Sequence, residues 1–418
     1  MKIVIVYGWH DDNKGDSAIV KGSIKILRQA FPNANFVIIP INQALSERRA
    51  YRHLLKDFSE ILTIEQSSYP SSKKSKLGYL KGVLKSWFGM VFRNPTLPDL
   101  KSIASADLVV CKGGHILHTE ARKTQLRAMV AMLQYAYWPV LAIRYGKPVV
   151  FLGHSLGPFY GSIDRMIASY ILRKLTAVFV REAISAKTAV KLGVPVSKIK
   201  LIPDLAFALK PLYSPAVESI IKKHGLKSGN FAVITVRQWF ANQSRFIQEM
   251  AELVRGLLRE SIVKKVAIVV HTTGPTFIED DHIASRELYQ LLQNENNIVL
   301  IDYDLSPEEM IALYGEAKLL VGTRFHSVIF ASIAGTPAYA ISYVGPKAEG
   351  IMEMMSVQHL VQDIHTFSAE KALTDIKSQD FTLWRAQIQE KVKGLHEQLE
   401  ELVPLLRSLV NGGEAWLR

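Results

Sequence analysis

Short apolar runs rich in β-branched residues alternate with helical patterns along nearly the whole chain, and this alternation limits the possible folds most strongly. Such runs are typical of strands that are buried on both faces, as in a parallel sheet covered by helices. The sequence therefore predicts an α/β fold with two doubly wound sheets. The first half contains KIVIVY, NFVIIP, DLVVC, PVVFLG, AVFV and IKLIP, and the second contains FAVITV, KVAIVVH, NIVLID, KLLVG and AYAIS.

A proline-punctuated stretch, DLAFALKPLYSP, separates the two sets of runs and is typical of a linker. We therefore predict an N-terminal domain over residues 1–210 and a C-terminal domain over residues 211–378. Residues 379–418 have the pattern of a long amphipathic helix that is interrupted or kinked at Pro404. A chain of 418 residues, 48% of them hydrophobic, is long enough to build two separate cores.

The formal net charge of +13 favours an anionic partner, which charge alone leaves open as nucleic acid, acidic lipid or a phosphorylated substrate. The single cysteine, Cys111, ends an apolar run, so we expect a buried structural thiol and no intrachain disulfide. No apolar stretch reaches the roughly 18 residues of a membrane span. The opening MKIVIVYG lacks the pattern of a signal peptide, and we expect a cytoplasmic protein.

Several common chemistries lack their motifs in this chain. There is no G-x-x-x-x-G-K-[ST] phosphate loop and no G-x-G-x-x-G after a strand, which disfavours an ATPase or a nicotinamide enzyme. No cluster of cysteine and histidine suggests zinc, and there is no G-x-S-x-G elbow. We expect neither a metal ion nor an organic cofactor.

The clearest candidate site follows the strands of the second half, because ligands of open parallel sheets bind at the carboxyl ends of the strands. Arg237, His271 and Arg324 each come directly after an apolar run, and His326 follows two residues later. If a helix begins at Phe325 or His326, its dipole and the Arg324 guanidinium would together attract a small dianion. His326 could then exchange a proton with the bound molecule, whereas its structural alternative is a helix cap.

Strand ends of the first half supply a second group of polar and glycine residues. Asp16 could simply cap a helix, Arg181 could form a surface ion pair, and the two glycines could let backbone amides approach a ligand. The group consists of Asn13 and Asp16, Gly113 and Gly114 with His115 and His118, His154, and Arg181.

In order and spacing, six stretches resemble the polysaccharide pyruvyl transferases, and the resemblance covers most of the chain. They are NKGDSAI, KGGHIL, GHSLGPF, VREAIS, LIPDLAF and GTRFHSVIFASIAGTPAYAISYVGPKAEGI.

The resemblance implies a fold similar to type B glycosyltransferases, with two Rossmann-like domains facing across a cleft. It implies transfer of pyruvate from phosphoenolpyruvate to two hydroxyls of a sugar, in a surface polysaccharide or its lipid-linked precursor, with formation of a cyclic ketal and release of phosphate. It places the catalytic role on His326 and the contact with phosphoenolpyruvate on Arg324. We expect Phe325, Arg237 and Arg181 to complete the donor site. Asn13, Asp16, Gly113, Gly114, His115, His118 and His154 are expected on the acceptor side.

Two other classes of function fit the same features. A nucleotide-sugar glycosyltransferase or epimerase of this fold would use a late carboxylate such as Glu349 or Glu353. A non-catalytic protein that binds anionic polysaccharide would need only the net positive charge.

Residues 71–95 interrupt the alternation of the first half with lysines interleaved among apolar and aromatic residues, and they include no acidic residue. This pattern is typical of an interfacial helix that contacts anionic lipid at the inner face of a membrane. A lid, or an extra helix packed on the core, is the alternative.

Overall fold

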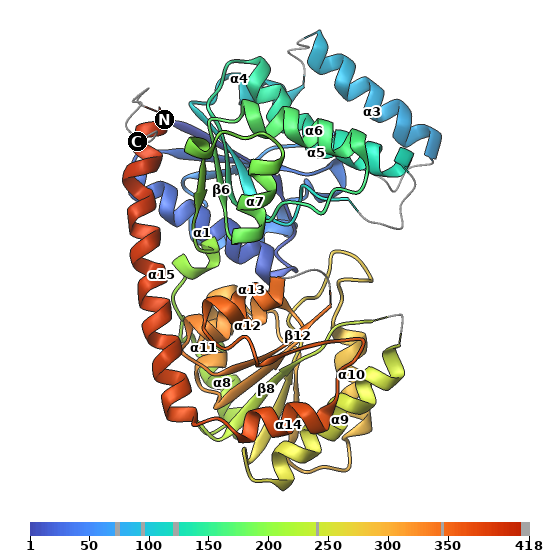
Figure 1. The fold of residues 1–418 in the computed structure, drawn as a ribbon, viewed down its shortest axis with the longest axis vertical. Coiled ribbons are helices and arrows are strands. Elements are labelled where there is room, and N and C mark those ends of the chain that lie inside the picture. Colours follow the sequence, from blue (N-terminus) through green and yellow to red (C-terminus); the bar gives the residue numbers. More distant parts are fainter. Residues whose placement is uncertain (72–75, 93–96, 120–124, 240–241, 344–346, 411–418) are drawn as a thin grey trace. The chain divides into compact units, whose positions relative to one another are not determined.

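The computed structural model describes residues 1–71, 76–92, 97–119, 125–239, 242–343 and 347–410. It contains two parallel sheets with helices on both sides of each (Figure 1). The strands are β1 Lys2–Gly8, β2 Asn35–Pro40, β3 Leu62–Ile64, β4 Leu108–Gly114, β5 Val149–His154, β6 Ala177–Val180, β7 Ile199–Leu201, β8 Phe231–Thr235, β9 Lys265–Val269, β10 Ile298–Ile301, β11 Leu319–Gly322, β12 Ala338–Ser342 and β13 Val361–Asp363.

Helices connect these strands, as crossovers between parallel strands require. They are α1 Lys14–Ala30, α2 Arg52–Phe58, α3 Lys76–Val91, α4 Pro98–Ala104, α5 Gln125–Arg144, α6 Ser162–Lys174, α7 Ala183–Lys191, α8 Pro215–Lys223, α9 Gln243–Arg259, α10 His282–Leu291, α11 Pro307–Gly315, α12 Phe325–Ile333, α13 Lys347–Met354, α14 Ala369–Lys377 and α15 Phe381–Val410. Short 3-10 helices span Gln43–Leu45, Arg48–Tyr51, Val196–Lys198 and Leu205–Ala208.

The two sheets share one strand order. The first runs β3-β2-β1-β4-β5-β6-β7 and the second runs β10-β9-β8-β11-β12-β13. This is the doubly wound Rossmann order, in which the direction of winding reverses between β1 and β4 in the first sheet and between β8 and β11 in the second. The predicted fold class, two Rossmann-like domains with a helical C-terminal segment, is confirmed. All eleven predicted strands are present, and the short edge strands β3 and β13 were not predicted.

Strand residues of the first sheet alternate between its two faces, and both faces are buried. Val4 and Val6 of β1 lie in the same apolar cluster as Trp138 and Leu141 of α5 and Ile171 of α6. The intervening strand residues are also buried, which explains the continuous apolar runs in the sequence. The lone cysteine, Cys111, is a buried free thiol of this cluster, and burial raises its pKa well above the ordinary value, as expected for a structural thiol.

The chain divides into two compact units whose boundaries differ from the prediction in two places. Unit 1 comprises residues 1–11, 19–208 and 397–418, and unit 2 comprises residues 12–18 and 209–396. The change from one unit to the other after Ala208 lies close to the predicted boundary at 210. The first turn of α1, however, belongs with unit 2. The C-terminal helix is likewise shared, because α15 belongs to unit 2 as far as His396 and to unit 1 from Glu397 onward.

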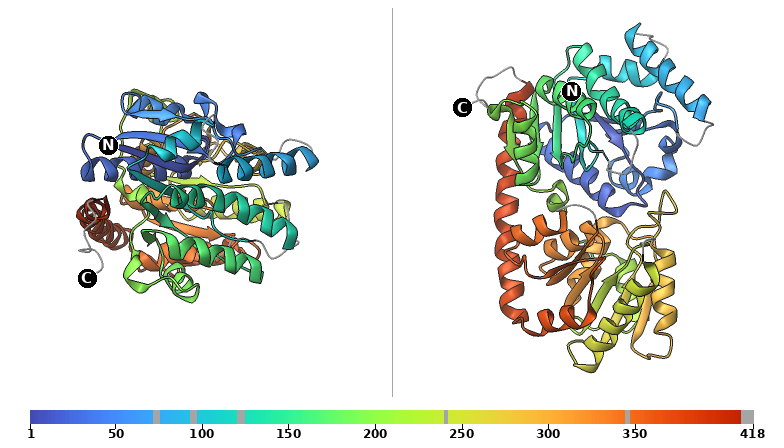
Figure 2. Two further views of the ribbon diagram at one scale, coloured as in Figure 1. Left: turned by 90° about the horizontal axis from the view of Figure 1, so that it is seen from above. Right: turned by 45° about the vertical axis from the view of Figure 1, so that its right-hand side comes forward.

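α15 continues through Pro404 as one helix, and its last part is fastened to unit 1. Arg407 donates hydrogen bonds from Nε to the Ala30 carbonyl at 3.0 Å and from Nη2 to the Gln29 carbonyl at 2.8 Å. Ala30 ends α1, so the arginine satisfies carbonyls that have no partner within that helix. Across the described residues, no helix is both long and apolar enough to cross a membrane. Figure 2 shows the layers of each unit from two further directions.

Candidate functional site

The carboxyl ends of β8, β9 and β11 bring three of the predicted residues of unit 2 together. β8 lies between β9 and β11 in the sheet, and Arg237, His271 and Arg324 follow these strands. This is the point at which the strand order reverses, where ligands of doubly wound sheets bind. Electrostatic interactions link the three side chains: Arg324 lowers the pKa of both Arg237 and His271, after the larger effect of burial.

The turn from β11 into α12 is held by small and hydroxyl residues. A Cβ atom on Gly322 would lie 2.4 Å from Ser327 Oγ, so only glycine leaves room for that side chain. Ser327 Oγ in turn lies 3.0 Å from Thr235 Oγ1 of β8 and donates to the Arg324 carbonyl at 2.7 Å. Arg324 takes the extended backbone conformation of an N-cap, and α12 begins at Phe325 as the sequence predicted.

Arg324 forms a bidentate ion pair with Asp281 instead of extending freely toward a ligand. Its Nε lies 3.0 Å from both carboxylate oxygens, and its Nη2 lies 2.6 Å from Oδ1 and 2.7 Å from the Glu279 carbonyl. Thr272 donates its backbone N–H to the same carboxylate at 3.0 Å. Burial lowers the pKa of Arg324, but the Asp281 charge and hydrogen bonds outweigh that effect and raise it. The guanidinium is therefore fixed in place, and its Nη1 makes no hydrogen bond with any described residue.

Arg237 is a buried cation that forms no ion pair with any described residue. Only 9% of its surface is exposed, its Nε donates to the Gln238 carbonyl at 3.3 Å, and its guanidinium carbon lies 3.8 Å from the centre of the Tyr343 ring. Burial lowers its pKa, and the nearby Arg324 adds to the effect. The Asp281 charge acts on this pKa in the opposite direction, but the Asp281 carboxylate is paired with Arg324. A buried charge that is only partly compensated is costly, so this position favours an anionic ligand.

The first turn of α1 lies against the ring of His326. A Cβ atom on Gly15 would be 2.2 Å from His326 Nδ1, so the imidazole packs directly on this backbone. Lys14 is buried, and its Nζ lies 2.7 Å from the exposed Asp304 carboxylate. Its positive charge is one of those that lower the pKa of His271. The motif NKGD and the motif GTRFH therefore form one site in unit 2.

Asn13 and Asp16 lie in the same place, which differs from the acceptor-side position in the N-terminal domain that we predicted for them. Asn13 Nδ2 donates to Glu279 Oε1 at 3.3 Å, and Asn13 Oδ1 accepts from the Asp16 backbone N–H at 3.2 Å. Both residues belong to unit 2 with Arg324 and His326. The local physical reason is that the α1 first turn pairs with the loop after β9, through the Asn13–Thr272 bridge.

Two further side chains of this site, those of His271 and Glu279, also have displaced pKa values. His271 is fully buried with Nδ1 3.0 Å from the Tyr314 hydroxyl, and burial, followed by the charges of Arg324, His326 and Lys14, holds its pKa well below the ordinary value. Glu279 is half-buried, and burial together with the Asp16 charge raises its pKa. The site therefore combines a neutral imidazole with a carboxyl that is more easily protonated than usual.

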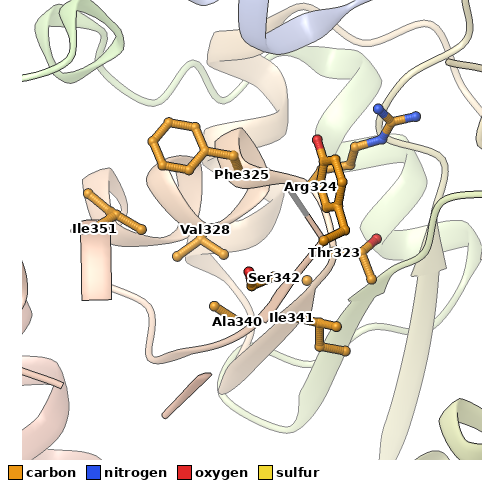
Figure 3. Close-up of a pocket in the computed structure, with 10 residues that line it drawn as sticks. Thr323, Arg324, Phe325, Val328, Ala340, Ile341, Ser342 and Ile351 are labelled. Carbon is orange, nitrogen blue, oxygen red and sulfur yellow. The ribbon is translucent and has the colours of Figure 1, made fainter. Parts of the chain in front are cut away.

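A small pocket adjoins the turn (Figure 3). Its wall is apolar at Phe325, Val328, Ala340 and Ile351, while the Arg324 guanidinium points away from these side chains. The half-buried Phe325, which we predicted at the donor site, contributes its ring to this wall, 5.1 Å from the His326 ring centre.

Arg181 lies in unit 1 and is used there as a structural cation. Its Nη1 lies 2.5 Å from Asp204 Oδ2, its Nε donates to Ser155 Oγ at 2.8 Å, and both ionic partners are buried. These contacts match the ion-pair alternative, and the donor-binding role of Arg181 stays a prediction. The pair is buried instead of lying on the surface, with 4% of the Arg181 side chain and 5% of the Asp204 side chain exposed.

His154 is also structural by its contacts. It is completely buried, its Nε2 lies 3.0 Å from the Cys111 carbonyl, and its ring stacks on Phe151. Burial lowers its pKa to about 3, so the imidazole is neutral. The acceptor-side role of His154 stays a prediction.

The loop after β4 keeps His115 and His118 together in unit 1. Their rings stack with centroids 4.1 Å apart, both side chains are half-buried, and His115 Nε2 lies 2.5 Å from the Gly157 carbonyl. The preceding glycines serve strand packing, because a Cβ atom on Gly113 would meet the Leu152 carbonyl oxygen at 2.6 Å, and Gly114 has a φ of 121°. The acceptor-side role of all four residues stays a prediction.

Sequence reasoning missed the partners that shape the site in unit 2. Asp281 and Glu279 lie in the loop that precedes α10, and Tyr343 lies just after β12. Lys14 stands inside a motif that we used for the family resemblance but did not select as a site residue. Among the described residues, no group of three or more histidine, cysteine, aspartate or glutamate side chains could hold a metal ion.

Known proteins resemble this chain in sequence and in fold. The chain is 24% identical over 385 residues to the amylovoran biosynthesis protein AmsJ of Erwinia amylovora, with 88% of this chain and 89% of AmsJ covered. Among solved structures, Anabaena HepE in complex with UDP and glucose matches with a TM-score of 0.56 at 14% identity, over 98% of this chain and 100% of HepE. The UDP-GlcNAc 2-epimerase of Neisseria meningitidis matches with a TM-score of 0.59 at 12% identity, over 97% and 99%. At these identities the two structures show the fold alone.

A family model identifies the family directly. It spans residues 13–345, which include both the α1 first turn and the turn from β11 into α12. It also includes Arg237, His271 and the loop before α10. The chain belongs to the polysaccharide pyruvyl transferase family.

Proposed function

We propose that this protein transfers pyruvate from phosphoenolpyruvate to two hydroxyls of a sugar, in a surface polysaccharide or its lipid-linked precursor, as a cyclic ketal. Membership of the polysaccharide pyruvyl transferase family supports pyruvyl transfer in polysaccharide biosynthesis. The observation that carries the donor assignment is Arg237, a buried guanidinium with no ion-pair partner among the described residues. Phosphoenolpyruvate carries a carboxylate and a phosphate, and it would supply negative charge beyond that of Asp281, which is paired with Arg324.

In the proposed complex, the anionic groups of phosphoenolpyruvate lie between Arg237 and Arg324. The Arg324 Nη1 group is available for a hydrogen bond, because Asp281 and the Glu279 carbonyl occupy its other donors. The N-terminus of α12 adds the positive end of a helix dipole. Arginines held in place before the reaction stabilise developing charge without reorganisation, so the proposed step requires no metal ion and no organic cofactor.

The proposed reaction begins with proton transfer to the methylene carbon of phosphoenolpyruvate, which makes C2 electrophilic. One sugar hydroxyl adds to C2 and loses its proton, and the phosphate group then leaves. The second hydroxyl closes the ketal, and its proton leaves with the phosphate. We assign the proton transfers to His326, which packs on Gly15 next to the arginines. His271 is held neutral by burial, so we give it no proton-transfer role.

The Arg237→Met variant tests the proposal. Hydrogen bonds from a charged donor contribute about 1.5–3 kcal/mol, so we expect the KM for phosphoenolpyruvate to rise roughly 10- to 100-fold while the fold is kept. The measurement is phosphate release from phosphoenolpyruvate with a panel of sugar acceptors, with the ketal product identified by mass spectrometry. Arg259→Met is the control, because Arg259 is an exposed arginine of the same unit. Hydrolysis of nucleotide sugars without phosphate release would contradict the proposed reaction and favour the glycosyltransferase or epimerase alternative.

The Gly15→Ala variant tests the position assigned to His326. The new methyl group would overlap the imidazole at 2.2 Å, so the ring must move. A displacement of about 1 Å in a catalytic group can reduce a rate roughly 100-fold, and we expect a loss of that order in kcat. The difference in helix propensity should not lower the free energy of unfolding, because alanine forms helices more readily than glycine. The matched control is Gly350→Ala in α13, where nothing lies within 4 Å of the new methyl group. Equal kcat for both variants would contradict the role of His326.

A further inference from the structure

Helix α3 of unit 1 has two apolar faces, of which only one is packed on the protein. Val83 and Met90 are buried in the core cluster of unit 1, and Trp87 packs against it. The opposite face exposes Leu80, Leu84, Phe88 and Val91, followed by Phe92. Leu84 and Phe88 are 62% and 65% exposed, which is unusual for side chains of this size. The spacing of these residues by three or four forms one continuous apolar stripe.

The position of α3 is fixed by contacts on its packed face. Gly82 allows the helix to approach Pro70, because a Cβ atom there would lie 2.8 Å from the proline Cβ. Ser86 Oγ lies 3.0 Å from the Ser68 carbonyl, to which it donates, and the Trp87 ring meets Tyr137 edge-on at 5.8 Å. Arg144 of α5 donates from Nη2 to the Val91 carbonyl at 2.8 Å and so caps the C-terminal end of α3. The exposed stripe is therefore a stable feature of the surface of unit 1, and α3 lies at the margin of that unit (Figure 1).

The charged side chains that α3 itself places beside the stripe are positive. Lys81 and Lys85 are exposed and lie one position after Leu80 and Leu84 along the helix. α3 contains no acidic residue. The neighbouring α6, which contacts α5 as α3 does, repeats this chemistry: Ile163, Met166 and Tyr170 are exposed beside Arg165, Arg173 and Lys174. Its one acidic residue, Asp164, is buried.

We propose that the exposed face of α3 is a membrane-binding surface that adsorbs to anionic bilayers. In an interfacial helix, apolar and aromatic side chains enter the boundary of the acyl chains while lysines meet anionic head groups, and α3 offers both in adjacent rows. A protein partner fits less well, because lysine is depleted from the cores of protein interfaces. This surface lies outside the site in unit 2, so the proposal does not depend on the reaction proposed above.

The interpretation of residues 71–95 from sequence is refined in two respects. One face of α3 packs on the core, as the alternative of an extra helix predicted. The other face exposes apolar side chains and lysines, which is the pattern of an interfacial helix. Trp87 belongs to the packed face, and a substitution there would disturb the core and would not test lipid binding. Lys73, Lys74 and residues 93–95 lie outside the described residues.

The test uses the full chain and sedimentation with vesicles. We expect the wild type to sediment with vesicles rich in phosphatidylglycerol at low salt, and to be released by high salt or by replacing the lipid with phosphatidylcholine. The Leu84→Ser/Phe88→Ser variant should bind at least about tenfold more weakly, because each side chain loses its transfer into the acyl boundary. Lys81→Gln/Lys85→Gln should weaken binding to anionic vesicles by roughly tenfold or more and reduce its dependence on salt.

The matched control is Leu383→Ser/Val196→Ser, which removes two exposed apolar side chains far from α3 in sequence, at 69% and 71% exposure. It should bind as the wild type does. Absence of wild-type binding at low salt, or equal binding by the α3 variants, would overturn the proposal. So would self-association of the wild type in the absence of lipid that Leu84→Ser/Phe88→Ser abolishes, since the face would then be an interface between two copies of this chain.

Discussion

Replacing His326 by glutamine is expected to reduce kcat for phosphate release by about 10²–10⁴-fold, the contribution typical of a general acid or base. Glutamine can still form hydrogen bonds in this position, but it cannot exchange a proton near neutral pH. Because the arginines that we assign to the donor site are unchanged, the KM for phosphoenolpyruvate should stay within about threefold of the wild-type value. Steady-state kinetics with saturating acceptor would measure both constants.

His359→Gln is the matched control, since His359 is an exposed histidine of the same unit. It should leave kcat unchanged, and the thermal unfolding midpoints of both variants should match that of the wild type. If His326→Gln kept near wild-type turnover, His326 would be a structural residue at the start of α12, and the proton transfers would have to be assigned elsewhere.

The sheet architecture could be predicted from the sequence because burial on both faces leaves a continuous apolar run. β8 reads FAVIT and β11 reads LLVG, and each is buried throughout. The two strands that were missed, β3 and β13, have three residues each and lie at sheet edges. β7 is equally short and also lies at an edge, but it was predicted because its apolar run continues past the strand into Ile202. β3 and β13 lack such a run, because polar residues interrupt them: Thr63 in β3, and Gln362 and Asp363 in β13.

The candidate site was predicted only in part, because the strand pattern locates the residues that follow each strand but not their partners. The rule that polar residues after parallel strands gather at one edge placed Arg237, His271 and Arg324 together. It does not reveal which charged residues compensate each other. Asp281 pairs with Arg324 across a loop between β9 and α10, and no local pattern in the sequence marks that carboxylate as the partner. The same limit applies to Arg181, whose partner Asp204 also lies at a distance along the chain.

The assignment of the α1 first turn to unit 2 was beyond sequence reasoning for another reason. A turn followed by a helix after the first strand is ordinarily counted with the sheet that the strand belongs to, and residues 13–16 were treated in that way. Gly15 contacts His326 and Asn13 contacts Glu279, so this turn belongs with unit 2. The one sequence signal for this contact is the glycine at position 15, because the absence of a side chain there lets the His326 imidazole approach.

The Arg324→Met variant is expected to have the largest effect on stability. The substitution leaves the fully buried Asp281 carboxylate without its cation, and breaking one side of a buried ion pair costs about 3–5 kcal/mol. From sequence we assigned Arg324 to donor binding alone, but its bidentate geometry indicates that it also holds the loop before α10 on the sheet. The measurement is the free energy of unfolding by denaturant, followed through the transition of unit 2.

Two further variants separate the ion pair from other effects of the substitution. Arg324→Met/Asp281→Asn should recover part of the loss, because the buried charge is then removed with its partner. Lys371→Met is the control for an exposed pair: Lys371 Nζ lies 2.7 Å from Asp375 and is 57% exposed, so its loss should cost less than about 1 kcal/mol. If Arg324→Met unfolded within about 1 kcal/mol of the wild type, the pair would add little to folding, and Arg324 would be held in the site mainly for the ligand.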